Sequence, residues 1–198
     1  SDVYKRQIYG VAVDVGSTTI AANLCNLETG DVISSAGAMN PQIRFGEDLM
    51  SRVSYSMMNT GGDLEMTKAV IDGLNSLFKE ITEEAKIDRN LILDSVFVCN
   101  PVMHHLLIGI DPFELGQAPF ALATSEQLNF SAKEINLEIN PQAKTYILPC
   151  IAGHVGADAA AVALSESPNN SDDLVLIVDV GTNAEIMLGS KTTGVLAC

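Results

Sequence analysis

One short pattern occurs near both ends of the chain. Residues 11–20 read V-A-V-D-V-G-S-T-T-I, and residues 176–186 read L-I-V-D-V-G-T-N-A-E-I. Each copy has an apolar strand, an aspartate at the end of that strand, a turn through glycine, and a second strand. A single copy is equally well explained as an ordinary hairpin, because D-x-G is common in turns. The two copies agree in strand hydrophobicity, acid position, glycine position and following strand, so together they favour a shared functional role.

The repeated hairpins have the chemistry of a phosphate and metal site. An aspartate at the mouth of a hairpin can hold a metal, while glycine lets a ligand approach the backbone N–H groups closely. Two such hairpins that face each other would clamp a nucleoside triphosphate from both sides. The chain contains no GxxxxGK[ST] loop and no GxGxxG that opens a helix, so the usual nucleotide-binding motifs do not account for such a site.

A third acid lies between the two hairpins, in the segment G-A-D-A-A-A at residues 156–161. Its small side chains let the predicted helix pack closely against a neighbour. Asp158 can be a helix N-cap, which would stabilise the helix by about 1 kcal/mol. It can equally be a general base or the ligand of a metal-bound water between the hairpins. A carboxylate can do both, so both interpretations stay open.

The rest of the chain alternates strand and helix patterns. The longest periodic segment predicts an amphipathic helix that covers one face of a sheet. Strands are expected at residues 8–14, 20–27, 32–39, 95–99, 145–148, 174–179 and 184–188. Helices are expected at residues 47–58, 64–85, 102–108 and 156–164. We expect an irregular excursion over residues 111–143 and a polar linker over residues 165–173.

Composition limits the class of protein. Hydrophobic residues make up 47% of the chain and charged residues 18%, a balance that allows a buried core. The formal net charge of -14 argues against non-specific electrostatic binding to nucleic acid or to an anionic membrane. No stretch approaches the roughly 18 to 20 apolar residues of a membrane span, and no signal peptide is evident, so we expect a cytoplasmic protein. Cys25, Cys99, Cys150 and Cys198 lack the spacing of a zinc or iron–sulfur site and are expected to be reduced structural thiols.

The order of these motifs resembles a known superfamily. The run D-V-G-S-T-T from Asp14, the helix around Asp158 and the run D-V-G-T-N from Asp179 resemble phosphate-1, connect-1 and phosphate-2 of the actin, sugar kinase and heat-shock ATPase fold. The resemblance is closest to the ATPase domain of the reductive activators of corrinoid proteins, and it runs from about residue 8 to the last residue. Its additional motifs lie at residues 40–48, 100–107, 149–158 and 179–183.

The resemblance implies a fold and a division of the chain. The implied fold is α/β and ribonuclease H-like, as in the actin-like ATPases, with helices flanking a mixed sheet and a truncated second lobe. Residues 1–7 would be a leader or linker remnant, residues 8–165 the first lobe, and residues 174–198 the start of the second lobe. In this fold the adenosine-binding motif follows phosphate-2, so we expect such a fragment to bind nucleotide poorly by itself.

The resemblance also implies a function. Family members use ATP to drive the reduction of a cobalt(II) corrinoid to cobalt(I), which restores a methyl-transferring corrinoid protein. The implied ligands and partners are ATP with Mg2+, a corrinoid protein, and an electron donor that acts through an upstream ferredoxin-like domain. The iron–sulfur cluster of the family belongs to that domain, and this chain has no cysteine set for it. Neither nucleic acid nor a membrane is implied, and a homodimer is left open. Two alternatives remain, a small-molecule kinase of the same fold and a non-catalytic nucleotide-sensing module.

Individual residues receive roles through the same resemblance. Asp14 and Asp179 would hold Mg2+ through water, and Asp158 would orient the attacking water, so these three acids form the implied catalytic set. Charge stabilisation would come from the metal and from backbone and hydroxyl donors instead of a P-loop lysine. The implied phosphate-binding donors are Gly16, Ser17, Thr18, Thr19, Gly181, Thr182 and Asn183.

Two groups of polar residues are left without a role. Arg44, Glu47 and Asp48 form either a surface ion-pair cluster at a helix start, of little value to stability, or part of a cleft or partner surface. The second group contains three histidines. His104 and His105 are adjacent, so on a helix their side chains point about 100° apart and would not easily bind one metal together.

We expect one of these two histidines to be packed and the other exposed. His154 lies in a glycine-flanked loop shortly before Asp158, so it is better placed for a site than the adjacent pair.

Overall fold

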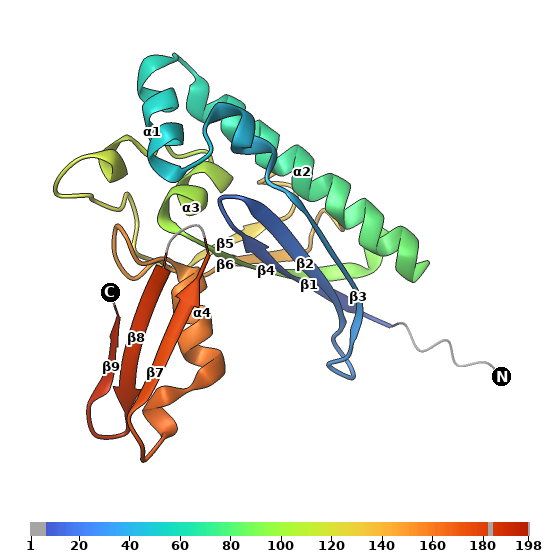
Figure 1. Ribbon diagram of the computed structural model, residues 1–198. Helices are drawn as coiled ribbons and strands as arrows, with labels where there is room; N and C mark the ends of the chain where they lie inside the picture. The colour runs from blue at the N-terminus through green and yellow to red at the C-terminus, as the bar shows by residue number, and fades with distance from the viewer. Residues whose placement is uncertain (1–6, 182–183, 198) are drawn as a thin grey trace.

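A six-stranded mixed sheet forms the centre of the larger part of the chain (Figure 1). The computed structural model describes residues 7–181 and 184–197. The strands of this sheet are β1 (Tyr9–Val15), β2 (Thr19–Asn26), β3 (Val32–Met39), β4 (Ile92–Cys99), β5 (Leu128–Ser131) and β6 (Lys144–Ile147). Their order across the sheet is β3-β2-β1-β4-β6-β5. The meander β1-β2-β3 is antiparallel, β4 runs parallel to β1, β6 runs parallel to β4, and β5 lies antiparallel to β6 at the edge.

The alternation of side chains in β1 determines where its acid points. Val13 and Val15 are buried, and Val13 pairs with the buried Ala22 of β2. Because successive side chains of a strand point to opposite faces, Asp14 points away from this core face. Val15 is in register with Cys99, the last residue of β4, so the parallel strands β1 and β4 end at the same edge of the sheet.

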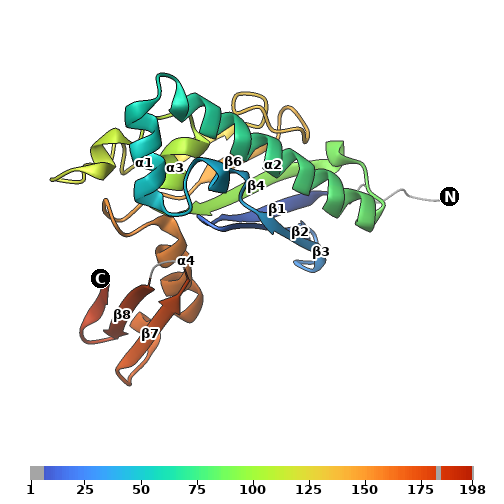
Figure 2. The same ribbon diagram turned by 45° about the horizontal axis from the view of Figure 1, so that its top comes forward.

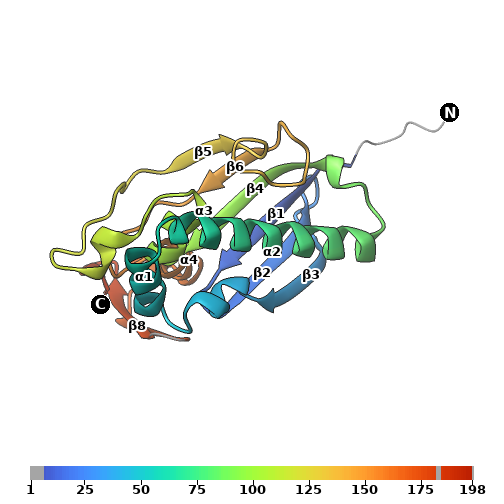
Figure 3. The same cartoon turned by 90° about the horizontal axis from the view of Figure 1, so that it is seen from above.

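Three helices lie on the core side of the sheet (Figure 3). They are α1 (Leu49–Met58), α2 (Gly62–Ala85) and α3 (Pro101–Leu107). α2 and α3 pack against strands of the sheet, and α1 packs against α2. α2 contacts β2 and β3 and buries an apolar stripe along its length. The fully buried part of this stripe comprises Met66, Val70, Leu74, Leu77, Phe78 and Ile81. In the part of the chain that the structure describes, no helix is both long enough and apolar enough to cross a membrane.

A second, smaller sheet follows α4 (Ala157–Glu166) in the chain. Its strands are β7 (Val175–Val180), β8 (Ala184–Ser190) and β9 (Gly194–Ala197), which pair antiparallel in that order. α4 lies beside this sheet in both side views (Figures 1 and 2). One face of the sheet exposes directly paired apolar side chains, Leu176 with Leu188 and Val178 with Ile186. The opposite face of β7 carries Asp179.

Element types follow the predicted pattern, with three differences. β5 lies inside the segment that we expected to be irregular, because its four residues have little alternation and it forms by pairing with β6. β9 was not predicted. The expected polar linker contains the end of α4 and a short 3₁₀ helix, η4 (Pro168–Asn170). Other short 3₁₀ helices are η1 (Pro41–Phe45), η2 (Arg89–Leu91) and η3 (Phe113–Gly116).

Candidate functional site

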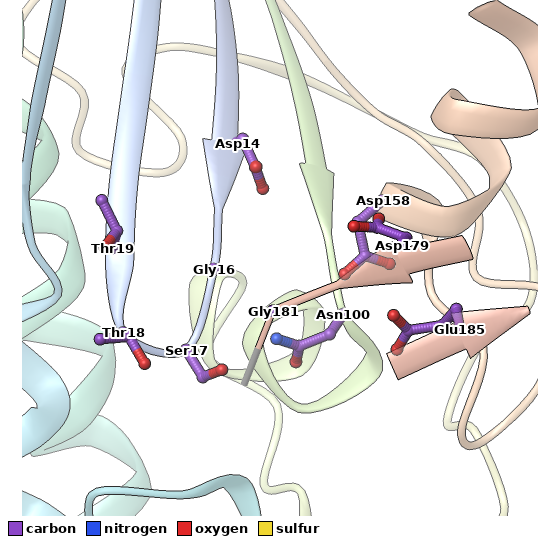
Figure 4. A pocket seen from close by; sticks show the side chains of 10 residues that line it. All are labelled: Asp14, Gly16, Ser17, Thr18, Thr19, Asn100, Asp158, Asp179, Gly181 and Glu185. Carbon is purple, nitrogen blue, oxygen red and sulfur yellow. The ribbon is translucent and has the colours of Figure 1, made fainter. Parts of the chain in front are cut away.

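A cavity of about 260 Å³ opens where β1, β7 and the start of α4 meet (Figure 4). The two repeated hairpins therefore border one cavity, and Asp14 and Asp158 come from elements on its two sides. Of the predicted site residues, Thr182 and Asn183 lie outside the described residues, and all the others line this cavity. The complete lining is Asp14, Gly16, Ser17, Thr18, Thr19, Asn100, Asp158, Asp179, Gly181 and Glu185.

The turn between β1 and β2 is closed by its own backbone. The Gly16 N–H donates to the carbonyl oxygen of Thr19 at 3.0 Å. A Cβ atom on Gly16 would lie 2.8 Å from that same oxygen, so any side chain at this position would open the turn. Glycine at position 16 permits this close approach, in agreement with the glycine that the repeated D-x-G pattern has at this point of the turn.

Asp158 lies in the first turn of α4, one residue inside the helix. Gly156 is the N-cap residue, and it caps without a side-chain hydrogen bond. The interpretation of Asp158 as the N-cap is therefore wrong, because α4 begins at Ala157, two residues earlier than a cap at Asp158 would require. Asp158 accepts one hydrogen bond from the Ala159 N–H at 2.9 Å, and its carboxylate lines the cavity.

Gly156 also determines how closely α4 approaches the end of β4. A Cβ atom at this position would lie 2.5 Å from the carbonyl oxygen of Cys99 and 2.6 Å from the Cα atom of Asn100. It would also lie 2.5 Å from Oδ1 of Asp158. Because Gly156 has no side chain, the start of α4 can pack against the end of β4, and Asp158 therefore lies at the edge of the sheet where β1 and β4 end.

Glu185 is a fourth carboxylate in the cavity, and the sequence reasoning missed it. It stands directly opposite Asp179 in the β7–β8 register, so both side chains lie on the same face of the small sheet. The signal was present in the sequence, because Glu185 is a single acid between the apolar or small residues Ala184 and Ile186. Asn100, which follows β4, is a second lining residue that was not predicted.

Three of these acids hold their protons more tightly than usual. Burial is the largest cause that raises the pKa of Asp14, of Asp158 and of Glu185, and neighbouring carboxylates raise all three further. Asp179 contributes to each of these shifts, and Asp158 contributes to those of Asp14 and Glu185. No lysine or arginine is among the lining residues. The cavity therefore carries concentrated negative charge that the lining does not neutralise.

This charge suits a cation that is held through water. Among the described residues, no group of three or more histidine, cysteine, aspartate or glutamate side chains is close enough to hold a metal directly. A hexacoordinate Mg2+ ion usually keeps several waters and uses one or two carboxylates, so the carboxylates around this cavity fit that mode of binding.

A second cavity of about 500 Å³ adjoins the first one. Asn100 and Glu185 line both cavities. The second cavity has mainly apolar walls, and His154 is one of its few polar residues. The His154 ring lies 4.5 Å from the ring of Phe120, centroid to centroid. His154 is thus near the acids, as its position before Asp158 suggested, but it does not line the acidic cavity.

The histidine pair on α3 differs from the prediction. Both His104 and His105 are buried, at 0% and 1% exposure, so the expectation that one is exposed is wrong. The reason is that α3 is buried along its whole length between α2 and the sheet. His105 is bonded to the Pro101 carbonyl oxygen at 2.8 Å and to the Ala123 N–H at 3.0 Å. Burial lowers the pKa of His104 to about 4, so its ring is neutral near pH 7.

Of the two interpretations left open for Arg44, Glu47 and Asp48, the ion-pair cluster is wrong. Within the described residues none of the three forms an ion pair. Asp48 instead caps α1, since its carboxylate accepts a hydrogen bond from the Ser51 N–H at 2.7 Å. Arg44 stacks its guanidinium 4.6 Å above the centre of the Phe45 ring. Asp48 also lines the second cavity.

The fold defines the class of this protein. An antiparallel meander β3-β2-β1 followed by parallel β4 and β6 is the arrangement of the ribonuclease H-like fold of the actin-like ATPases, as predicted. The chain belongs to the RACo middle region family, whose model matches residues 9–169. The predicted resemblance to reductive activators of corrinoid proteins is thereby confirmed.

Two relatives support this assignment. The chain is 30% identical over 190 residues to the corrinoid activation enzyme RamQ of Eubacterium limosum, covering 96% of this chain and 32% of RamQ. It is 33% identical to the solved structure of a reductive activator for corrinoid, iron-sulfur protein, with a TM-score of 0.94. That match covers 100% of this chain and 31% of the activator. The chain thus spans about a third of the length of the relatives that it matches.

Proposed function

We propose that this chain is the phosphate-binding part of an ATPase that drives the reductive activation of a corrinoid protein. The family and the two relatives, both described as activators of corrinoid proteins, support the process. The observation that carries the ATPase proposal is the cavity that Asp14, Asp158 and Asp179 share with the turn after β1. We further propose residues 8–165 as the first lobe and residues 174–198 as the start of the second.

The phosphates would lie against the turn after β1, where Gly16, Ser17, Thr18 and Thr19 line the cavity. Backbone N–H groups in such a turn form a concavity that binds anions. Gly181 contributes from the turn after β7 on the opposite side of the cavity. The carboxylates of the cavity would repel the phosphates of a nucleotide, so binding would require a cation in addition to these N–H donors.

Asp14 and Asp179 would hold Mg2+ through water. The ion, when bound, neutralises charge on the phosphate oxygens and on the surrounding carboxylates. The fit rests on the raised pKa values of Asp14 and Asp158 and on the absence of a cationic side chain from the cavity lining. Glu185 adds negative charge beside Asp179 and would contribute to the same water-mediated contacts.

Asp158 would orient the water that attacks the terminal phosphate. Its carboxylate lines the cavity, and its raised pKa makes it a better proton acceptor than an ordinary aspartate. The hydrogen bond from the Ala159 N–H fixes one carboxylate oxygen, which leaves the other for the water. Attack forms the new P–O bond and breaks the bond to ADP, and the proton of the water passes to Asp158.

The energy of this hydrolysis would drive the transfer of one electron to cobalt(II), giving cobalt(I). The electron would come from a donor through an upstream ferredoxin-like domain with an iron–sulfur cluster. Closure of the two lobes about the cavity would link the nucleotide state to the surface that contacts the corrinoid protein.

The test is phosphate release by the full-length protein, with and without a cobalt(II) corrinoid protein and a reductant. We expect ATP hydrolysis to depend on Mg2+ and to accelerate when the corrinoid protein is present. A rate of ATP hydrolysis that is the same with and without the corrinoid protein would contradict the proposed coupling.

A second candidate function is a small-molecule kinase of the same fold. The 500 Å³ cavity favours it, because a phosphoryl acceptor could lie there beside Glu185 and Asn100. A kinase would leave the terminal phosphate on an organic product. Recovery of all of that phosphate as inorganic phosphate would therefore exclude this alternative.

A further inference from the structure

The carbonyl oxygens of the turn after β1 all face hydrogen-bond donors of the chain itself. Asn40 donates to two of them and Arg52 donates to one, from segments that follow β3. The bonds are Asn40 Nδ2 to Gly16 O at 2.8 Å, Asn40 N–H to Thr18 O at 2.8 Å, Gly16 N–H to Thr19 O at 3.0 Å, and Arg52 Nη2 to Ser17 O. The turn is thus fixed from the side that faces the core.

Arg52 is buried completely, at 0% exposure, although it is charged. In the part of the chain that the structure describes, it forms no ion pair. Its other hydrogen bonds go to the Gly46 carbonyl oxygen at 3.0 Å, Gln42 Oε1 at 3.4 Å and Met103 Sδ at 3.2 Å. Burial lowers its pKa to about 10, so Arg52 remains charged near pH 7.

Peptide geometry connects these bonds to the cavity. In a trans peptide unit the C=O group and the following N–H group point in opposite directions. Because Asn40 binds the Gly16 carbonyl on the core side, the Ser17 N–H is directed away from the core. Arg52 fixes the Ser17–Thr18 peptide in the same way. Ser17 lines the cavity, and within the described residues its N–H and hydroxyl groups donate to no partner.

We propose that Arg52 and Asn40 are positioning residues for phosphate binding, which hold the turn so that the Ser17 N–H faces the cavity. This inference rests on the proposed function. It gives a role to two motifs that were left unassigned, because Met103 Sδ accepts from both Arg52 and Asn40 at 3.2 and 3.4 Å. The motif at residues 40–48 and the motif at residues 100–107 therefore meet beneath the turn.

A charged side chain at this position does more than stabilise the fold. An apolar residue at this position could not donate to the carbonyl oxygens of Ser17 and Gly46, and a buried acceptor that loses its donor is unfavourable. Loss of the bond to the Ser17 carbonyl would also release the Ser17–Thr18 peptide from its fixed orientation. We therefore expect a loss of overall stability together with a larger loss of order in the turn.

The test uses three variants of the full-length protein, Arg52→Met, Arg52→Lys and the control Ser56→Ala. Ser56 lies one helical turn further along α1, is also buried, and bonds Asp111 Oδ1 at 2.6 Å, away from the turn. Mg·ATP affinity is measured by calorimetry, and hydrogen exchange of the Gly16 and Asn40 N–H groups is measured without nucleotide. Both of these N–H groups bond carbonyls of the turn.

For Arg52→Met we expect at least about tenfold weaker Mg·ATP binding, the equivalent of one lost hydrogen bond to a charged group. We also expect faster exchange at Gly16 and Asn40. Arg52→Lys should lie between this variant and the wild type, because lysine can donate to one acceptor but cannot reproduce the planar fork. Ser56→Ala should change neither measurement.

Unchanged exchange in Arg52→Met would overturn the inference, whatever happens to nucleotide binding. Faster exchange with unchanged Mg·ATP affinity would also overturn it, since the turn would then not need Arg52 to bind phosphate. A wild-type protein that binds no Mg·ATP would instead refute the proposed function, together with the part of this inference that concerns phosphate. The wild-type measurement thus distinguishes the two failures.

Discussion

Asp14, Asp158 and Glu185 share one cavity, and the pKa of each is raised by burial and by neighbouring carboxylates. An acid with a raised pKa in the folded state binds its proton more tightly there than in the unfolded chain. The free energy of unfolding therefore falls as the pH rises through the window between the unfolded pKa, 3.8 for an aspartate, and the higher folded pKa. At neutral pH the folded protein carries the full electrostatic penalty, which a bound cation would relieve.

Asp158→Asn should raise the melting temperature at pH 7 and abolish ATP hydrolysis. The amide removes the penalty of a buried charge but keeps an oxygen that can accept from the Ala159 N–H. Thermal unfolding followed between pH 3 and pH 8 checks this, and the advantage of the variant should vanish below about pH 3.8. The exposed Asp31→Asn serves as the control and should show no such effect. Lower stability of Asp158→Asn at pH 7 would contradict the electrostatic explanation.

Glu185→Gln should stabilise the small sheet by about 0.2 to 1 kcal/mol, because like charges stand directly opposite each other in the β7–β8 register. The same substitution should weaken Mg2+ binding in the presence of ATP. Chemical unfolding and a Mg2+ titration of ATP hydrolysis measure the two effects. Glu166→Gln, at an exposed position at the end of α4, should change neither.

Single residues also show how far sequence reasoning reaches. Glu185 could have been predicted, because it interrupts an apolar strand at the position opposite an acid of the repeated pattern. The burial of Arg52 could not, because its acceptors come from segments around residues 17, 42, 46 and 103 that only the fold brings together. Arginine on a short amphipathic helix is ordinarily a surface residue. The same non-local packing buries both His104 and His105.

Elements position the acids through close backbone contacts, and α4 is the clearest case. The run of alanines at its start predicted close packing, and α4 contacts the β4 strand. The exact approach depends on Gly156, whose missing side chain leaves room for the Cys99 carbonyl and for Asp158. The two hairpins, by contrast, follow from local patterns of strand and turn residues, which explains why they were predicted correctly.

Gly156→Ala should destabilise the protein by about 1 to 3 kcal/mol, since the added methyl group would overlap backbone atoms that cannot move away easily. It should also weaken Mg·ATP binding, because Asp158 would be displaced. The matched control is Gly37→Ala in β3, where a Cβ atom would meet only the Ile20 carbonyl oxygen at 3.7 Å. Chemical unfolding of both variants measures the difference, and equal stability would show that α4 can shift without consequence.

The molecule as a whole leaves one apolar sheet face uncovered. Leu176, Val178 and Val180 of β7 are 61%, 52% and 75% exposed, and Ile186 of β8 is 43% exposed. An exposed patch of this kind promotes association. The chain also spans only about a third of the length of its relatives.

A polypeptide of these 198 residues should therefore self-associate through this face. The double substitution Val178→Thr and Ile186→Thr keeps β-branched residues in the strands but lowers the apolar area, so it should shift the polypeptide toward monomer. Analytical ultracentrifugation at several concentrations checks this. Identical association of the variant and the parent would place the contact elsewhere on the molecule.

The central claim is that the cavity between the two hairpins binds Mg·ATP and that its hydrolysis drives corrinoid reduction. The most direct measurement is the appearance of the cobalt(I) absorbance when full-length protein, reductant and ATP are mixed with a cobalt(II) corrinoid protein. We predict ATP-dependent cobalt(I) formation by the wild type and its loss in both Asp14→Asn and Asp179→Asn, with Asp31→Asn as active as the wild type. Cobalt(I) formation that persists in the two cavity variants, or that proceeds equally without ATP, would contradict the account.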